Sequence, residues 1–104
     1  MYPEVSTGPG VTRQVLDTRP ELMTVRFRFL TEGAEGALHS HPHVQSTYVR
    51  SGRFRFTVGE RRFEVGPGDA FVIPPGAVHG CLCLEPGELI DSFAPARDDF
   101  LQKD

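Results

Sequence analysis

The sequence lacks the features of an exported or membrane-spanning protein. It has only two cysteines, Cys81 and Cys83, and they lie too close together in one extended segment to form a disulfide of normal geometry. Its longest apolar runs, such as Ala70–Ile73, are far shorter than the roughly 20 residues of a membrane-spanning helix. Its N-terminus also lacks the basic and then apolar pattern of a signal peptide. We therefore expect a cytoplasmic protein with reduced cysteines and no membrane partner.

The sequence also has no excess of basic residues. Eleven Lys and Arg stand against 14 Asp and Glu, so the formal net charge is −3, and the isoelectric point is about 5.8. Such a chain has little to attract a phosphate backbone, and we expect no nucleic-acid partner. The 104 residues, of which 38% are hydrophobic, fit a single domain spanning residues 1–104 with one core.

Short segments with alternating hydrophobic and polar residues fill most of the chain. In residues 23–30, Val25, Phe27 and Phe29 alternate with polar side chains, which is the pattern of a strand with one buried face. Many short strands between Gly and Pro turn signals predict an all-β sandwich or barrel, because no segment before the tail has a helical period. Further strands are expected at residues 37–41, 45–50, 53–58, 61–65, 70–73, 78–84 and 88–93.

The two ends of the chain are expected to lie outside the barrel, which we assign to residues 21–93. Residues 1–20 contain several Gly and Pro and predict an extended N-terminal arm with at most one short strand, near residues 11–16. Residues 94–104 are expected to form a short C-terminal tail, in which residues 96–101 could make a helical turn.

Potential metal ligands are concentrated where one expected strand turns into the next. His39 and His41 are two residues apart, so on a strand their rings point to the same face, and Gln45 is close enough to add an amide oxygen. His79 follows a tight Pro-Pro-Gly turn, from which a paired strand could carry its ring to the same point. These four side chains are the candidate metal site. His43 is expected to turn away, to the surface or behind the ligands.

Two spaced motifs give the chain a resemblance to the cupin family. The first cupin motif places Gly, His-x-His, an acidic ligand and Gly at fixed intervals, and is similar to Gly33, His39, His41, Gln45 and Gly52. The second places Gly, Pro-x-Gly, His and Asn in order, and is similar to Gly68, Pro74, Gly76, His79 and Cys83. Gln replaces the usual Glu in the first motif, and Cys replaces the usual Asn in the second. The resemblance implies a jelly-roll barrel, or double-stranded β-helix, that binds one divalent metal ion.

A narrower resemblance, to the KdgF-type pectin-degradation cupins, comes from Gln45 together with the C-terminal run of residues 91–100. Members of that family convert the unsaturated monouronates left by pectate or alginate lyases into linear ketonised sugars. The resemblance implies a metal-dependent enzyme with a small anionic sugar as its substrate, and small cupins commonly form homodimers. It places Asp91 as a proton shuttle, Phe93 as an apolar wall and Arg97 as the residue that binds the uronate carboxylate.

The chemistry of the ligands narrows the choice of metal. Three imidazoles and an amide are neutral, so a bound ion keeps its full charge and acts as a strong Lewis acid. Nitrogen-rich ligation suits Zn, Ni, Fe, Co or Cu better than Mg or Ca, and Mn also remains open.

The residues leave other interpretations open. The chain could be a dioxygenase-type cupin, or a non-catalytic cupin that binds a metal or a sugar. Asp91 and Arg97 could form no more than a surface ion pair at the tail. Cys81 and Cys83 are expected to be small buried hydrophobic residues, with a thiolate metal ligand as the alternative.

Overall fold

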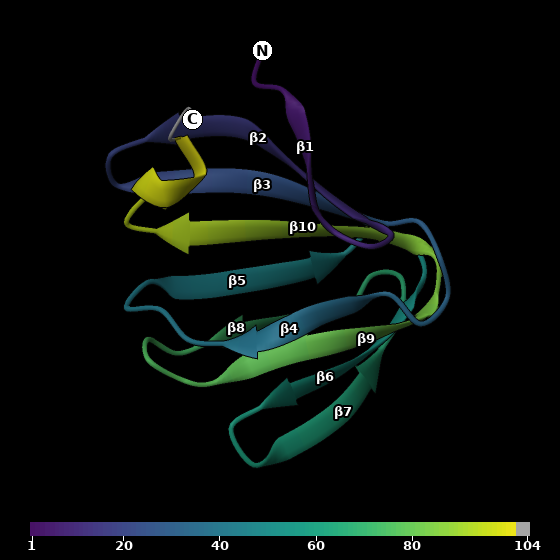
Figure 1. Cartoon of the computed structure of the whole chain (residues 1–104). Coiled ribbons are helices and arrows are strands. Elements are labelled where there is room, and N and C mark those ends of the chain that lie inside the picture. The colour runs from purple at the N-terminus through teal and green to yellow at the C-terminus, as the bar shows by residue number, and fades with distance from the viewer. Residues whose placement is uncertain (102–104) are drawn as a thin grey trace.

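Two antiparallel β-sheets make up nearly the whole structure (Figure 1), a computed structural model that describes residues 1–101. The last element of the described residues is a short 3-10 helix, η1 (Asp98–Leu101), within the region where a helical turn was expected. The all-β prediction is confirmed. The strands are β1 (Glu4–Gly8), β2 (Val11–Arg19), β3 (Leu22–Phe29), β4 (Glu35–His39), β5 (Val44–Val49), β6 (Arg53–Val58), β7 (Arg61–Val65), β8 (Ala70–Ile73), β9 (His79–Glu85) and β10 (Gly87–Ala94).

The sheets are assembled from strands that are far apart in the sequence. One has six strands in the order β1-β2-β3-β10-β5-β8, and the other has four in the order β4-β9-β6-β7. Figure 1 shows β1, β2, β3, β10 and β5 of the larger sheet above the smaller sheet, with β8 drawn lower, at the level of β4, and η1, in yellow, beside β2 and β3. The long-range pairs of β4 with β9 and of β5 with β8 bring the two candidate metal motifs together.

Inward-facing apolar side chains of both sheets form the core. Phe54 of β6 is fully buried, and its ring meets Phe29 of β3 edge-on with the centroids 5.1 Å apart. A second cluster contains Met23, Val25 and Phe93 on the inner face of the six-stranded sheet. Burying side chains of this size stabilises the fold by about 1.5–3 kcal/mol each. Gln45, Thr47 and Asp91 are polar residues buried on the inner face of the six-stranded sheet, and their burial does not stabilise the fold in this way. Their presence there points to a functional role.

The expectation of an N-terminal arm with at most one short strand is wrong. Residues 1–20 contain both β1 and the nine-residue β2, and β2 pairs with β3 from Val11 opposite Phe29 to Arg19 opposite Leu22. Three of the Gly and Pro residues that indicated an extended arm, Pro9, Gly10 and Pro20, instead lie in tight turns at the ends of β2. Gly10, with a φ of 73°, makes the first of these turns in a conformation that residues with side chains rarely adopt. The expected boundary between arm and barrel therefore falls inside the β2–β3 hairpin.

The other strands lie where the alternation predicts them, with shifts of one or two residues at several ends. β6, β7 and β8 have the expected bounds. The largest shift is in β4, which ends at His39 rather than at residue 41. Across residues 1–101, the structure has no helix with the length and apolar character needed to cross a bilayer.

Candidate metal centre and adjoining pocket

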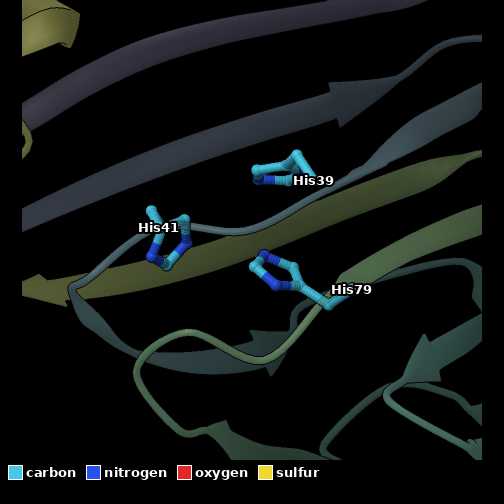
Figure 2. Close-up of side chains that lie close together, drawn as sticks. All are labelled: His39, His41 and His79. Atoms are coloured by element: carbon cyan, nitrogen blue, oxygen red, sulfur yellow. The ribbon is translucent and has the colours of Figure 1, made fainter.

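Three of the four predicted metal ligands lie together at one end of the four-stranded sheet (Figure 2). His39 is the last residue of β4 and His79 is the first of β9, and the two are directly paired in the sheet. Their ring centroids are 4.3 Å apart, and the ring of His41 lies 5.6 Å from His39 and 4.9 Å from His79. One nitrogen from each ring can be chosen so that all three lie within 4.8 Å of one another. The predicted convergence of the histidines is therefore what the structure shows.

The local reason for this convergence differs from the one expected. His41 does not share a strand with His39, because β4 has already ended and His41 lies in the following loop. The loop is fixed by a hydrogen bond from the backbone N–H of Gly76 to the carbonyl of His41, at 2.9 Å. The Pro-Pro-Gly turn before His79 thus also holds the backbone of the second histidine.

Backbone carbonyls set the tautomer of all three imidazoles. The Nδ1 atoms of His39 and His79 lie 2.8 and 2.9 Å from the carbonyl oxygens of residues 37 and 77, and that of His41 lies 3.0 Å from the carbonyl of residue 43. A carbonyl oxygen only accepts, so each Nδ1 must carry the proton and each Nε2 keeps its lone pair. Such a second shell orients the ring for metal binding. Burial also lowers the pKa of His41 and His79, which favours the neutral form that a metal requires.

Gln45 connects the histidines to the buried acid. It lies on β5, in the opposite sheet, and its Oε1 is 3.0 Å from Nε2 of His41. Its Nε2 donates to the hydroxyl of Thr47 at 3.0 Å and to Oδ2 of Asp91 at 3.2 Å. Because the amide nitrogen is used in this way, the amide oxygen must face the histidines. Gln45 is thereby oriented as an oxygen ligand.

Asp91 is a carboxyl group in an unusual environment. It lies on the inner face of β10, only 5% exposed, opposite Thr47 of β5. Burial raises its pKa to about 7, while hydrogen bonds from Thr47 and Gln45 act in the opposite direction. Both the protonated and the ionised form are thus accessible near neutral pH.

The buried polar atoms at this site without a partner in the described residues are Nε2 of His79, Oδ1 of Asp91 and, behind the ligands, Nδ1 of His43. Buried polar groups are nearly always hydrogen-bonded, so such atoms are suited to a ligand or a water molecule. A lone pair on Nε2 of His79, beside two similar imidazoles and an amide oxygen, fits a divalent transition metal. Oδ1 of Asp91 is free to meet a substrate atom.

A cavity of about 520 Å³ adjoins the histidines, a volume within the usual range of small-molecule sites. All three residues predicted to be catalytic, Asp91, Phe93 and Arg97, line it. Residues that the sequence prediction did not include also take part. They are Arg13 of β2, Thr47 beside Asp91, and Phe100 of η1, whose ring contacts Phe93 with a centroid distance of 5.6 Å.

Arg97 is held beside the aromatic wall of the pocket. Its Nε and Nη2 donate to the two carboxylate oxygens of Asp99, at 3.0 and 2.8 Å, which lowers the pKa of Asp99. Its Cζ lies 5.2 Å from the ring centroid of Phe93 and 4.2 Å from that of Phe100. The alternative of an Asp91–Arg97 surface ion pair is wrong, since Asp91 is buried against Gln45 and Arg97 pairs with Asp99. One edge of the guanidinium, formed by Nη1 and Nη2, is left for a ligand.

The remaining candidates take ordinary roles. Cys83 is 1% exposed and packs in the core with Phe54, while Cys81 lines the pocket, and both thiols are free. Burial raises the pKa of Cys81 to about 12, so it is a neutral thiol rather than a thiolate. His43 lies behind His41, to which it offers its backbone carbonyl.

Comparison with known proteins gives consistent matches. The family model described as "Cupin domain" matches residues 26–93. The pectin degradation protein KdgF of Dickeya dadantii is 39% identical over 97 residues, which cover 90% of this chain and 86% of the relative. The structure of KdgF from a Halomonas species superposes with a TM-score of 0.89 at 38% identity and covers 95% of this chain and 93% of that one. An RmlC-like cupin from Shewanella frigidimarina gives a TM-score of 0.89 at 41% identity, covering 95% and 88%.

Proposed function

Since this chain belongs to the cupin family and is a homologue of the KdgF pectin-degradation proteins, we propose that it is a metal-dependent enzyme that converts unsaturated monouronates into linear ketonised sugars. The observation that supports this most is the buried pair of Gln45 and Asp91. It joins a cluster of three histidines to a buried acid that lines a sugar-sized cavity and has one oxygen without a partner in the described residues.

His39, His41, His79 and Gln45 are the residues that would hold the metal. When bound, a divalent ion would polarise a sugar oxygen and stabilise negative charge on it. The chain's own task is then to hold the sugar and to move protons.

Asp91 is the proposed proton carrier. Opening of the hemiacetal breaks the bond between the anomeric carbon and the ring oxygen. The anomeric hydroxyl loses its proton and becomes an aldehyde carbonyl, and the ring oxygen gains a proton and becomes the hydroxyl oxygen of an enol. The enol oxygen then loses a proton while the neighbouring carbon gains one, so the product is a ketone with the composition of the substrate. Asp91 is suited to take and return such a proton, because its Oδ1 is unpartnered and its pKa of about 7 is close to neutral pH.

Phe93 and Arg97 would position the sugar. Phe93 gives an apolar wall on the same face of β10 as Asp91, two residues away. Arg97 would approach the uronate carboxylate with its free Nη1–Nη2 edge while Asp99 fixes the other edge.

The test is an assay with purified unsaturated galacturonate and the corresponding alginate-derived monomer. Turnover removes the double bond conjugated with the carboxylate, so the ultraviolet absorbance of the substrate should fall on addition of metal-loaded protein. Asp91→Ala should abolish most of this activity and leave the metal content unchanged. An Asp91→Ala protein with full activity would refute the role of the acid.

Two other outcomes would replace the proposal. Oxygen uptake with an iron-loaded protein would favour a dioxygenase-type cupin. Stoichiometric binding of metal or sugar without any turnover would favour a non-catalytic binding protein.

We also propose that the chain forms a homodimer in the cytoplasm. The outer face of β5 and β8 supports the homodimer. Tyr48 and Val72 are 46% and 63% exposed there, and both side chains point to the same side of the sheet. Light scattering on the purified protein tests the dimer, and Val72→Asp should weaken it if this face is the interface.

A further inference from the structure

An arginine occupies a position in β2 where a core residue would be expected. Val11 and Val15 are buried on the inner face, and Arg13 lies between them with the same orientation. Its neighbour across the sheet is Phe27 of β3, another inward-facing residue. A charge in such a row is costly unless something compensates it.

The compensation comes from stacking and from the charge of Asp99, which acts on the pKa of Arg13 against the lowering caused by burial. The guanidinium carbon of Arg13 lies 4.0 Å from the ring centroid of Phe100, which Arg97 also contacts. Within residues 1–101, Arg13 makes no side-chain hydrogen bond or ion pair, in contrast to Arg97 with its bidentate contact to Asp99. The donors of Arg13 are therefore held at the pocket without an acceptor of their own.

The charges around Phe100 add up to an anion site. Arg13 and Arg97 bring two positive charges and Asp99 brings one negative charge, which leaves one positive charge for a ligand. The other acidic residues of the pocket are Asp91 and Glu35, and Glu35 is exposed on β4 of the opposite sheet.

We propose that Arg13 is a second residue that binds the substrate carboxylate, together with Arg97, and that it determines the preference of the pocket for anionic over neutral sugars. The proposal rests on the uronate chemistry proposed above. A guanidinium binds a carboxylate through two parallel hydrogen bonds, a geometry that Lys cannot reproduce. Arg13 would supply such a fork from β2, and the free Nη1–Nη2 edge of Arg97 would meet the same carboxylate from the side of η1.

The position of Arg13 also suits the size of the substrate. In the sheet register, Arg13 aligns with Phe27 and Leu89, while Asp91 lies one inward row further along β10. Two residues along a strand and two strands across separate their Cα atoms by about 12 Å. Arg13 and Asp91 line the same cavity of about 520 Å³, which is large enough to hold one sugar ring.

The experiment compares Arg13→Met and Arg13→Lys with the parent chain, all loaded with the same metal. Arg13→Met should raise KM for the unsaturated uronate about 10- to 100-fold, the effect of one or two hydrogen bonds to a charged group, with a much smaller change in kcat. The KM of Arg13→Lys should lie between that of the parent and that of Arg13→Met. Metal content and melting temperature should not fall, because Met suits an inward position. Arg61→Met is the matched control, since Arg61 stacks on Phe63 outside the pocket, 5.2 Å from its ring centroid.

A binding measurement without turnover separates this inference from the proposed reaction. Calorimetry should show that the parent binds D-galacturonate more tightly than D-galactose and that Arg13→Met removes this preference. If the parent shows it without ketonising unsaturated uronates, the proposed reaction fails while the role of Arg13 stands. If Arg13→Met keeps the parental KM and the parental preference, the role of Arg13 is refuted whatever the reaction.

Discussion

Replacing Gln45 by Glu would give the chain the ligand that the first cupin motif usually carries, yet we expect it to inactivate the enzyme. The amide nitrogen of Gln45 now donates to Oδ2 of Asp91 at 3.2 Å. In the variant a carboxylate oxygen takes the place of this nitrogen, so a donor facing an acceptor becomes two acceptors facing each other.

The size of the effect follows from the distance. Two unit charges 3.2 Å apart repel by about 5 kcal/mol at an effective dielectric constant of about 20. Closely paired buried carboxylates avoid such a cost by retaining one proton between them. Asp91 would then no longer give and accept a proton independently. Because general acid–base catalysis contributes about 10²- to 10⁴-fold, kcat should fall by at least about 100-fold.

The assay must separate loss of the metal from loss of proton transfer. A Glu oxygen is as good a ligand as an amide oxygen, so elemental analysis should still find one ion per chain in Gln45→Glu. Gln14→Glu is the matched control, because Gln14 lies on β2 beside Arg26 and outside the pocket, and it should keep full activity. Parental kcat in metal-replete Gln45→Glu would refute the argument that position 45 must be neutral.

Three further predictions test the site and the fold. His79→Ala should abolish stoichiometric metal binding. It should also abolish the stabilisation by metal, which is about 2.7 kcal/mol at a free metal concentration of 100 times Kd. His43→Ala should change neither property, and elemental analysis and melting curves measure the two. In metal-free protein, Asp91→Asn should raise the free energy of unfolding at about pH 8 by up to about 4 kcal/mol, and by much less near pH 4. The reason is that folding raises the pKa of Asp91 from 3.8 to about 7, so the ionised acid destabilises the fold increasingly as the pH rises from about 4 to 7. Urea titrations at both pH values measure this difference. Equal stability of Asp91→Asn and the parent at pH 8 would contradict the burial effect. Gly52→Ala should lower the free energy of unfolding by well over 1 kcal/mol, because Gly52 has a φ of 82° and a Cβ would lie 2.6 Å from a backbone oxygen. Gly59→Ala has open space around the new Cβ and should lower it by only about 1 kcal/mol. Similar losses of stability for the two variants in urea titrations would contradict the steric argument.

The strands of the barrel could be predicted because alternation and turn residues act locally. The bounds of β6, β7 and β8 follow from these signals alone. β1 and β2 could not be recognised in the same way, since Gly and Pro indicate interruption and do not distinguish a tight hairpin turn from an extended arm. Which of the two forms depends on pairing with β3, a contact that local pattern does not encode.

The metal ligands could be predicted from spacing, but the pocket could not. His39 and His41 converge although only one of them is on the strand, so the motif was a better guide than strand geometry. Arg13 and Phe100 meet because η1 folds back over β2, and nothing near either residue in the sequence announces that contact. A signal for Arg13 existed nonetheless, as a charged residue in phase with Val11 and Val15 in an amphipathic strand.

The choice of an amide at position 45 explains how one pocket can hold both a metal and an acid. The histidines belong to β4, its following loop and β9, whereas Asp91 belongs to β10 of the other sheet. Gln45 is the side chain that contacts both groups, with its oxygen toward His41 and its nitrogen toward Asp91. The amide oxygen offers a lone pair on the side of the histidine Nε2 atoms and the amide nitrogen donates to Asp91, and among side chains of this length Gln alone has both groups and no charge. Under the proposed function, the departure from the usual acidic ligand lets a working carboxyl group lie beside a bound metal.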